Sequence, residues 1–297
     1  MPFKDIDIFV RAATAILQGT DPYSLPNLEV FYPLPFFFLF IPFTGLPDPV
    51  VHILWTAIQV IILVVILRSR ALTAVWSIPV LATLVFGQAG IVMLGLFTRL
   101  RASRAAGVAL AFIALKPILV LLLAPWMLWQ WWRRDRRQIV WFVLVLGILV
   151  LAAFLVEPDW VVRFWSRTGE RARVGIVASV WGWFAIFPIP IWLGGAAIIS
   201  VILTIWAWRK NDFDLIATVG CLINPFIFSY DLVLLLGILR KQSFVIGFVA
   251  ISWFAFTISA FQSNDRASAL LSVATLGALL WEKRRTAKLN SEELSNR

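Results

Sequence analysis

Long apolar runs separated by short polar segments fill most of the chain. The uninterrupted runs cover residues 50–68, 138–156, 191–208, 243–261 and 267–282. A helix of about 20 apolar residues crosses the hydrocarbon core of a bilayer, so these runs are predicted to be membrane helices. Proline, glycine or a single polar group interrupts four further apolar stretches, at 31–45, 72–98, 105–132 and 214–239. The pattern predicts an all-α polytopic membrane protein with about ten transmembrane or half-spanning helices.

The start of the chain is amphipathic instead of uniformly apolar. Its apolar positions recur at helical spacing, which predicts a helix of about three turns. These positions are Ile6, Phe9, Val10, Ala13, Ile16 and Leu17. Gly19 suits a left-handed C-cap, and Thr20-Asp21-Pro22 is a turn signal. Asp5 and Asp7 lie at the helix start, where the helix dipole favours negative charge, and Asp5 could be a simple N-cap.

Composition supports an integral membrane protein. The 297 residues are 61% hydrophobic and 14% charged, with a mean hydropathy of +0.89, and a soluble fold could not bury so much apolar surface. The net charge is +10, and the Lys and Arg residues cluster at the ends of apolar segments. This arrangement indicates the positive-inside pattern of membrane proteins and not nucleic-acid binding. A single cysteine, Cys221, excludes a disulfide framework and a cysteine zinc site. His52 is interpreted as a core or interface residue, and neither a metal site nor a cofactor is expected.

Basic clusters define the expected topology. Arg133–Arg137 is the strongest cytoplasmic marker, but the clusters share one side only if 72–98, 105–132 and 214–239 each form a returning pair of short helices. The breaks in these pairs would carry Gln88, Lys116 and the 224–231 segment towards one shared site. We expect one membrane domain, residues 1–282, which opens with an extracytoplasmic amphipathic helix, and a disordered cytoplasmic tail, residues 283–297.

A polar loop after residue 156 departs from the positive-inside pattern. It contains Arg163 and Arg167 on the side opposite Arg133–Arg137. Contacts with phosphate or lipid headgroups explain this exception. A solvated loop, balanced by Glu157, Asp159 and Glu170, is the alternative.

The opening resembles that of glycosyltransferase family 87, whose members are polytopic C-type enzymes that use polyprenyl-phosphate sugars. The matching elements are Asp5, Ile8-Phe9, Ala12-Ala13, Gly19, Asp21-Pro22-Tyr23 and Tyr32-Pro33 with Pro35. The resemblance implies that Asp5 is the catalytic base in an extracytoplasmic loop, with Asp7 in reserve. In the family a transmembrane helix precedes this aspartate, whereas four residues precede it here, so either the start is truncated or a partner supplies that helix.

Three later motifs extend the resemblance. Lys116-Pro117 resembles the family's Lys-Pro element and implies a grip on the lipid phosphate, with snorkelling as the alternative. Gln88 matches a Gly-Gln break, and lining the site or pairing helices explains it equally well. Asn224-Pro225 with Tyr230 and Asp231 resembles the family's late element, although Asn replaces the usual Ser and the usual His is missing. Tyr32, Asn224, Tyr230 and Asp231 are therefore candidate site-lining residues.

The implied function is transfer of a hexose, with mannose among the candidates, from a polyprenyl-phosphate sugar to an extracytoplasmic lipid or glycan acceptor. Asp5 acts as base, Lys116, Arg163 and Arg167 bind the donor phosphate, and Trp and Phe side chains line the prenyl groove. The protein is expected to be a multi-pass protein of a bacterial cell membrane. The alternatives are a transporter or lipid flippase, which also needs broken helices and intramembrane charges, and a catalytically inactive scaffold.

Overall fold

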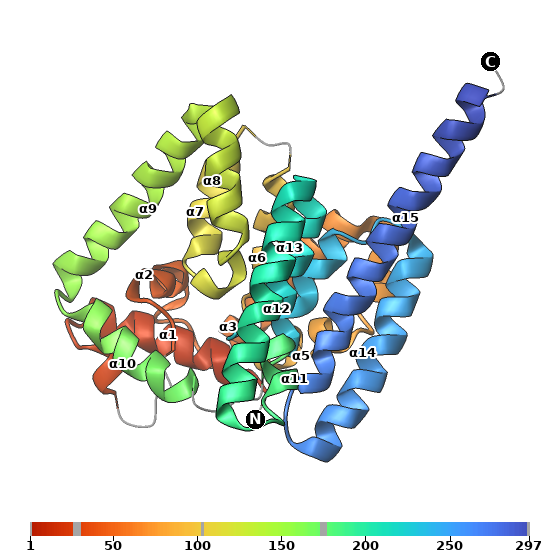
Figure 1. The fold of residues 1–297 in the computed structure, drawn as a ribbon. Helices are drawn as coiled ribbons and strands as arrows, with labels where there is room; N and C mark the ends of the chain where they lie inside the picture. Colours follow the sequence, from red (N-terminus) through yellow and green to blue (C-terminus); the bar gives the residue numbers. More distant parts are fainter. Residues whose placement is uncertain (1, 26–30, 102–103, 173–176, 296–297) are drawn as a thin grey trace.

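The computed structural model describes residues 2–25, 31–101, 104–172 and 177–295, and this part of the chain contains helices and no strand (Figure 1). The α-helices are α1 (Lys4–Leu17), α2 (Leu34–Phe37), α3 (Asp48–Leu67), α4 (Ala71–Ala74), α5 (Ile78–Phe86), α6 (Gly90–Arg99), α7 (Ala106–Ala114), α8 (Leu123–Arg134), α9 (Arg136–Val156), α10 (Trp160–Ala172), α11 (Val180–Phe184), α12 (Ile189–Lys210), α13 (Phe213–Leu222), α14 (Gln242–Gln262) and α15 (Ala269–Ser295). The 3-10 helices are η1 (Pro22–Ser24), η2 (Phe38–Phe43), η3 (Arg68–Arg70), η4 (Pro117–Val120), η5 (Ser229–Gly237) and η6 (Arg266–Ser268).

Four helical segments of the described chain are long and apolar enough to cross a membrane. They are Asp48–Ala74, Arg136–Val156, Ile189–Lys210 and Gln242–Gln262, and α5 with α6 forms a further candidate bent by 119°. The predicted all-α membrane architecture is therefore confirmed, whereas the predicted count of about ten is not. Proline, glycine and polar residues divide most of the remaining apolar stretches into helices too short to span alone. The predicted span 267–282 lies largely in α15, where a run of charged residues begins at Glu282, and it is not among the four candidates.

The interrupted stretches fold as pairs of short elements. α5 and α6 meet at Gly87–Ala89, α7 and α8 are separated by Lys116 and η4, and α13 and η5 are separated by 223–228. Each break contains a residue that ends helices and was visible in the sequence. Gly87, in a left-handed conformation, follows α5, Pro117 follows α7, and Pro225 follows α13.

Basic residues gather at one end of the molecule, which we call the basic end. Asp214 at the start of α13 pairs with Arg101 after α6 and, at 3.6 Å, with Arg240 after η5. Asp212 accepts from Lys283 of α15 at 2.5 Å, and Arg70 donates to the carbonyl oxygen of Leu239. The α8–α9 junction and the end of α15 lie at the same end, and α1 and α10 lie at the opposite one, the α1 end (Figure 1).

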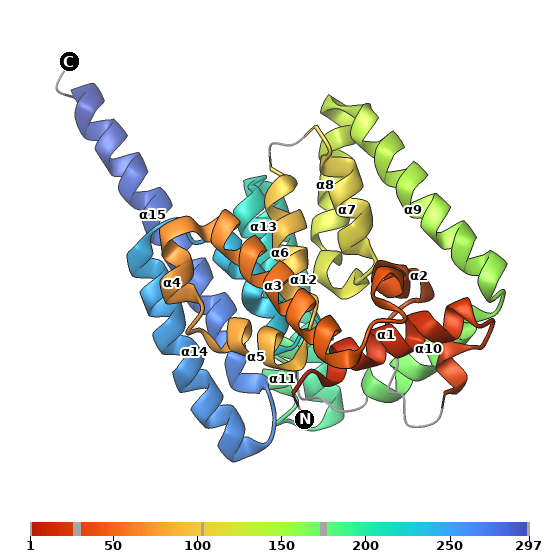
Figure 2. The same cartoon turned by 180° about the vertical axis from the view of Figure 1, so that it is seen from behind.

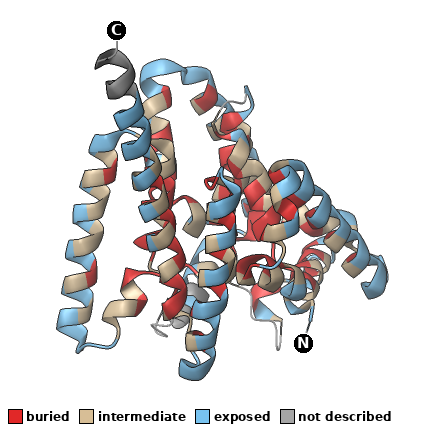
Figure 3. Cartoon of the chain, turned by 90° about the vertical axis from the view of Figure 1, so that its right-hand side faces the viewer, coloured by how far each residue is buried: buried red, intermediate tan, exposed pale blue. Residues whose placement is uncertain are grey.

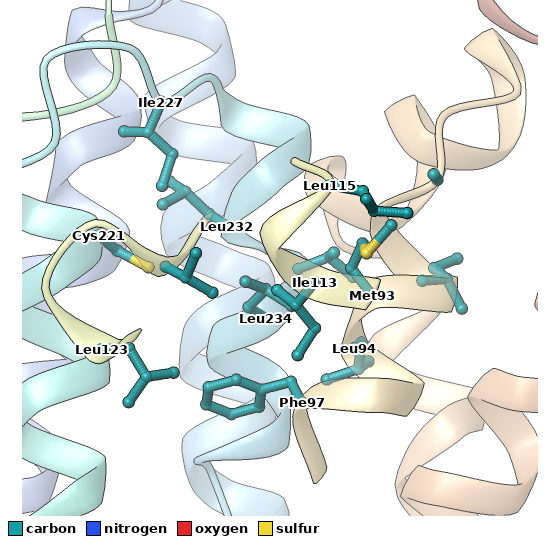
Figure 4. Packing of buried hydrophobic residues seen from close by; sticks show 14 of the residues in the cluster. Met93, Leu94, Phe97, Ile113, Leu115, Leu123, Cys221, Ile227, Leu232 and Leu234 are labelled. Atoms are coloured by element: carbon teal, nitrogen blue, oxygen red, sulfur yellow. The ribbon is translucent and has the colours of Figure 1, made fainter. Parts of the chain in front are cut away.

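The core lies where α6, α7, α13 and η5 meet. Figure 4 shows Met93, Leu94 and Phe97 of α6 facing Leu232 and Leu234 of η5. The outward faces of the long helices remain exposed (Figure 3). These faces are rich in valine, isoleucine and leucine, as expected of surfaces that contact lipid.

Two expectations about polar segments were wrong. The predicted polar loop with Arg163 is helix α10, because arginines alternate with Val161, Val162 and Trp165 in an amphipathic pattern that forms a helix at an interface. The tail from Lys283 was predicted to be disordered, whereas α15 continues to Ser295. Residues with high helix propensity continue beyond Lys283. Lys283 itself forms an ion pair with Asp212, the N-cap of α13, which fixes the first turn of the tail.

Candidate active site

An aromatic cluster packs α1 against Tyr32 and helix α2. The Phe9 ring meets Tyr32 and Phe36 edge-on at 5.1 Å each, and Tyr32 stacks on Phe36 at 4.4 Å between ring centroids. All three side chains are buried. Burial of each large apolar side chain contributes roughly 1.5–3 kcal/mol, so this packing fixes α1 relative to Tyr32.

A hydrogen-bonded chain connects Asp5 to the break between α5 and α6. The side-chain amide of Gln88 donates to Asp5 Oδ2 at 2.8 Å, and Gln88 Oε1 accepts from the Tyr32 hydroxyl at 3.1 Å. The Tyr32 carbonyl oxygen accepts from the buried hydroxyl of Tyr23 at 2.8 Å. Phe3 is the N-cap of α1, so Asp5 is not the N-cap and its carboxylate is oriented by Gln88.

Gly87 allows α1 to approach this break closely. Its φ is +71°, and a Cβ at this position would lie 2.6 Å from Cγ2 of Ile6, the residue after Asp5. Trp55 Nε1 donates to the Gly87 carbonyl oxygen at 2.9 Å. The contact between Asp5 and Gln88 therefore depends on the absence of a side chain at the preceding position.

We expect Gly87→Ala to displace α1 and to break the contact between Asp5 and Gln88. Any function that depends on this contact should fall at least tenfold, which corresponds to a loss of about 1.4 kcal/mol. Gly19→Ala is the matched control. Gly19 has a φ of +67°, and its Cβ would meet nothing within 4 Å, so it carries a similar conformational cost of about 1–2 kcal/mol without the clash. Equal activity losses in both variants, with equal falls in melting temperature, would remove the positioning role of Gly87.

Lys116 and Asp231 form a buried ion pair next to Tyr32. Lys116 Nζ lies 2.5 Å from Asp231 Oδ1, and the two side chains are 1% and 0% exposed. The ammonium also lies 5.5 Å from the ring centroid of Tyr32 and 5.0 Å from that of Tyr230, within cation–π range. Asp231 Oδ2 accepts from the Phe228 backbone N–H at 3.2 Å. Tyr32 thus contacts Gln88 and Lys116, and Lys116 pairs with Asp231, so side chains from the three interrupted stretches meet beside Tyr32.

Asn224 links two of these breaks. Its side-chain amide donates to the carbonyl oxygen of Ile118, and its Oδ1 accepts from the Phe226 N–H at 2.9 Å. The structure thus gives Asn224 a bracing role between η4 and the segment before η5. Tyr230 stacks on Phe228 at 5.7 Å, and its carbonyl oxygen accepts from the Thr83 hydroxyl at 3.3 Å.

Comparison with known protein families decides the class of this protein. The chain matches glycosyltransferase family 87 over residues 31–282, which is most of its length. The chain belongs to glycosyltransferase family 87. No curated protein and no solved structure matches it. The α-helical membrane protein described above is therefore a membrane glycosyltransferase.

The matched region of this family-87 glycosyltransferase contains most of the cluster. Tyr32, Gln88, Lys116 and Asp231 lie within residues 31–282, and Asp5 precedes them. The connection of Asp5 to the matched region is its hydrogen bond with Gln88. The assignment of Asp5 therefore depends on this geometry and on the opening motif.

Asp7 has a different partner from Asp5 in the glycosyltransferase. Its Oδ1 lies 2.7 Å from Nε2 of His52 on α3, and the His52 ring stacks on Phe3 with centroids 4.3 Å apart. His52 is thus an interface residue between α1 and α3, as expected. Among the described residues, no group of three or more His, Cys, Asp or Glu side chains could hold a metal ion.

Arg163 connects α10 of the glycosyltransferase to the turn after α1. It pairs with Asp21 and lies 3.4 Å from Glu157, with its side chain 39% exposed. The hydrogen bond to Asp21 raises the pKa of Arg163, and burial raises the pKa of Tyr23, next to this turn. Arg167 is on the same helix, but its side chain lies outside the described residues.

Asp265 was not predicted to contact the segment that carries Tyr230 and Asp231. It follows α14, where its Oδ2 accepts from the Ser229 N–H at 2.5 Å and its Oδ1 accepts from the Ser268 hydroxyl at 3.0 Å. Burial raises the pKa of Asp265. Asp265 therefore fixes the start of η5, on which Tyr230 and Asp231 lie, and no motif around it signalled this contact.

Proposed function

We propose that this glycosyltransferase moves a hexose from a polyprenyl-phosphate sugar to an acceptor hydroxyl at the α1 end, with Asp5 as general base. The observation that carries the proposal is the partly exposed Asp5 carboxylate, which Gln88 holds where the α5–α6 break meets Tyr32. Mannose is among the hexoses that fit this proposal. The acceptor is a lipid or a glycan.

One carboxylate is sufficient for this chemistry. Asp5 takes the proton from the acceptor hydroxyl, whose oxygen attacks C1 of the sugar, and the bond from C1 to the phosphate oxygen breaks. The leaving polyprenyl phosphate carries the electron pair as a stable anion, so the acid that protonates the leaving group in glycoside hydrolysis is not required.

The donor phosphate is assigned to α10 in this proposal. Arg163 is partly exposed at the α1 end, and a guanidinium can bind phosphate through two parallel hydrogen bonds. Arg167, one turn further on, is proposed to act with it. Lys116 is enclosed and neutralised by Asp231, so we propose that it positions Tyr32 and Tyr230.

The prenyl chain is proposed to follow the apolar face of α10. Val162 and Trp165 are 71% and 74% exposed, and the helix also contains Arg163 and Arg167. A helix with apolar side chains on one face and arginines on another lies in the interface between lipid and water, with its apolar face against the acyl chains. This position would bring a lipid-linked phosphate beside the arginines.

The α1 end is proposed to face the extracytoplasmic side, and the basic end the cytoplasm, with residues 1–282 as the membrane domain and 283–297 as its tail. Basic segments are retained in the cytoplasm, since moving a Lys or Arg through the membrane centre costs about 3 kcal/mol.

Cysteine labelling tests this orientation. In a Cys221→Ser background, Thr20→Cys in the exposed turn after α1 is expected to react with an impermeant thiol reagent in intact cells. Asp135→Cys at the exposed α8–α9 junction is the matched control and is expected to react only after lysis. Labelling of Thr20→Cys only after lysis would place Asp5 in the wrong compartment for this proposal.

Release of the carrier separates a transferase from a transporter or flippase. Purified protein in lipid nanodiscs is incubated with polyprenyl-phosphate hexoses, labelled in the sugar and in the prenyl chain, and with membrane glycolipids as acceptors. We expect free polyprenyl phosphate and glycosylated acceptor in equal amounts. Intact donor after prolonged incubation, together with movement of donor across proteoliposome membranes, would support the transporter.

A further inference from the structure

A hollow of about 580 Å³ opens at the basic end, far from α1. It lies between the carboxyl-terminal halves of α3 and α6, which pack side by side (Figure 2), and reaches Gly237 of η5. Its walls are mainly apolar and include Ile62, Ile66, Val92 and Leu96. None of the residues described above as the candidate active site lines it.

Two glycines in the lining let the surrounding elements pack closely. A Cβ on Gly95 would lie 3.0 Å from Cγ2 of Ile62, so glycine at this position allows α6 to approach α3. A Cβ on Gly237 of η5 would lie 2.9 Å from Cδ1 of Leu94 on α6. A large side chain at Gly95 would therefore enter the hollow or push α3 and α6 apart.

Positive charge surrounds its mouth. Arg70 and Arg99 both line the hollow, and no acidic residue does. Arg99 is exposed, and Arg70 is partly exposed while it donates to the Leu239 carbonyl oxygen. An apolar hollow whose lining includes two guanidinium groups is complementary to an acyl chain attached to a phosphate.

The hollow is short enough to lie within one leaflet of a bilayer. Its lining follows α3 from Ile61 to Leu67, which is about 9 Å at the rise of an α-helix, and continues to Arg70 of η3. Half of a hydrocarbon core is about 15 Å. An acyl chain that ends at the bilayer midplane is long enough to cover this lining, so the hollow does not require a long polyprenyl chain.

We propose that the hollow binds an anionic phospholipid from the leaflet at the basic end. An acyl chain lies between α3 and α6 over Gly95, and the phosphate lies against Arg70 and Arg99. The site is distinct from the donor site proposed at the α1 end, and the inference does not depend on that proposal.

Binding of phosphatidylglycerol and phosphatidylcholine to the detergent-purified full chain, measured by native mass spectrometry, tests the proposal. Both lipids carry the phosphate, but the trimethylammonium group of phosphatidylcholine cancels its charge and is repelled by Arg70 and Arg99. We therefore expect phosphatidylglycerol to bind at least tenfold more tightly, about 1.4 kcal/mol. Arg99→Gln alone and together with Arg70→Gln should remove most of this preference. The matched control is Arg284→Gln with Arg285→Gln, two exposed arginines of α15 at the same end, which should leave the preference unchanged.

A filling variant tests the apolar part of the site. Gly95→Leu should weaken binding of both phospholipids, whereas Gly147→Leu on α9, where a Cβ would meet nothing within 4 Å, should not. Equal affinity for the two phospholipids, or an equal loss in the α15 control, would overturn the proposal. Displacement of phosphatidylglycerol by an equimolar amount of polyprenyl phosphate would assign the hollow to the donor and would also overturn it.

Discussion

Asp5→Asn is expected to lower the rate of sugar transfer about 10³-fold, within the range of 10²–10⁴ that a general base contributes. Asparagine keeps the size of the side chain and its hydrogen bond with Gln88, but it cannot accept the acceptor's proton. Donor affinity and the melting temperature should therefore remain close to those of the wild type. Transfer rates under single-turnover conditions, with donor binding measured separately, check this expectation.

Asp7→Asn is the matched control for Asp5→Asn. Asp7 lies on the same helix, but it contacts His52 and not Gln88, so its variant should lose some stability and retain activity. The reverse pattern, with transfer lost in Asp7→Asn and kept in Asp5→Asn, would move the base two residues along α1. Loss in neither variant would remove the catalytic role from this helix.

Lys116→Met is expected to destabilise the protein by about 3–5 kcal/mol, since removal of one partner leaves the buried Asp231 carboxylate uncompensated. Activity should fall with it, because Tyr32 and Tyr230 lose the ammonium between their rings. Denaturation of the purified protein in mild detergent measures the effect on stability. An unchanged unfolding midpoint would contradict the buried pair.

The double variant Lys116→Met with Asp231→Leu separates two roles of the lysine. Its stability should return to near that of the wild type, because an apolar pair of similar volume often replaces a buried ion pair without loss. If Lys116 does not contact the donor phosphate, donor affinity in this variant should stay within about threefold of the wild type, less than 1 kcal/mol, while activity remains reduced because Tyr32 and Tyr230 still lack the ammonium. A loss of tenfold or more would restore the predicted contact between Lys116 and the donor phosphate.

Local signals explain how much of this architecture could be predicted. Apolar spacing and Gly19 define α1, and Gly87 and Pro117 mark breaks in apolar runs, because these residues act on the backbone where they stand. The shared position of Gln88 and Lys116 followed from the topology that places all basic clusters on one side. The proximity of Gln88 and Lys116 was thus predictable, although their hydrogen-bond and ion-pair partners were not.

The partners depend on contacts between distant segments. Asp231 is 115 residues from Lys116, and nothing in either motif indicates that the carboxylate neutralises the lysine. Asp265 reaches Ser229 from a loop without a recognisable motif. α10 was missed for a different reason, since a high density of arginine was interpreted as a loop although its apolar residues have helical spacing.

Photocrosslinking of the donor tests the central claim most directly. A polyprenyl-phosphate hexose with a diazirine on the sugar is irradiated with the purified enzyme, and the labelled peptides are identified by mass spectrometry. We predict labels on the peptides that contain Asp5, Gln88 and α10, all suppressed by unlabelled donor. Competed labels confined to the basic end, at the α8–α9 junction or along α3 and α6, would contradict an active site built around Asp5.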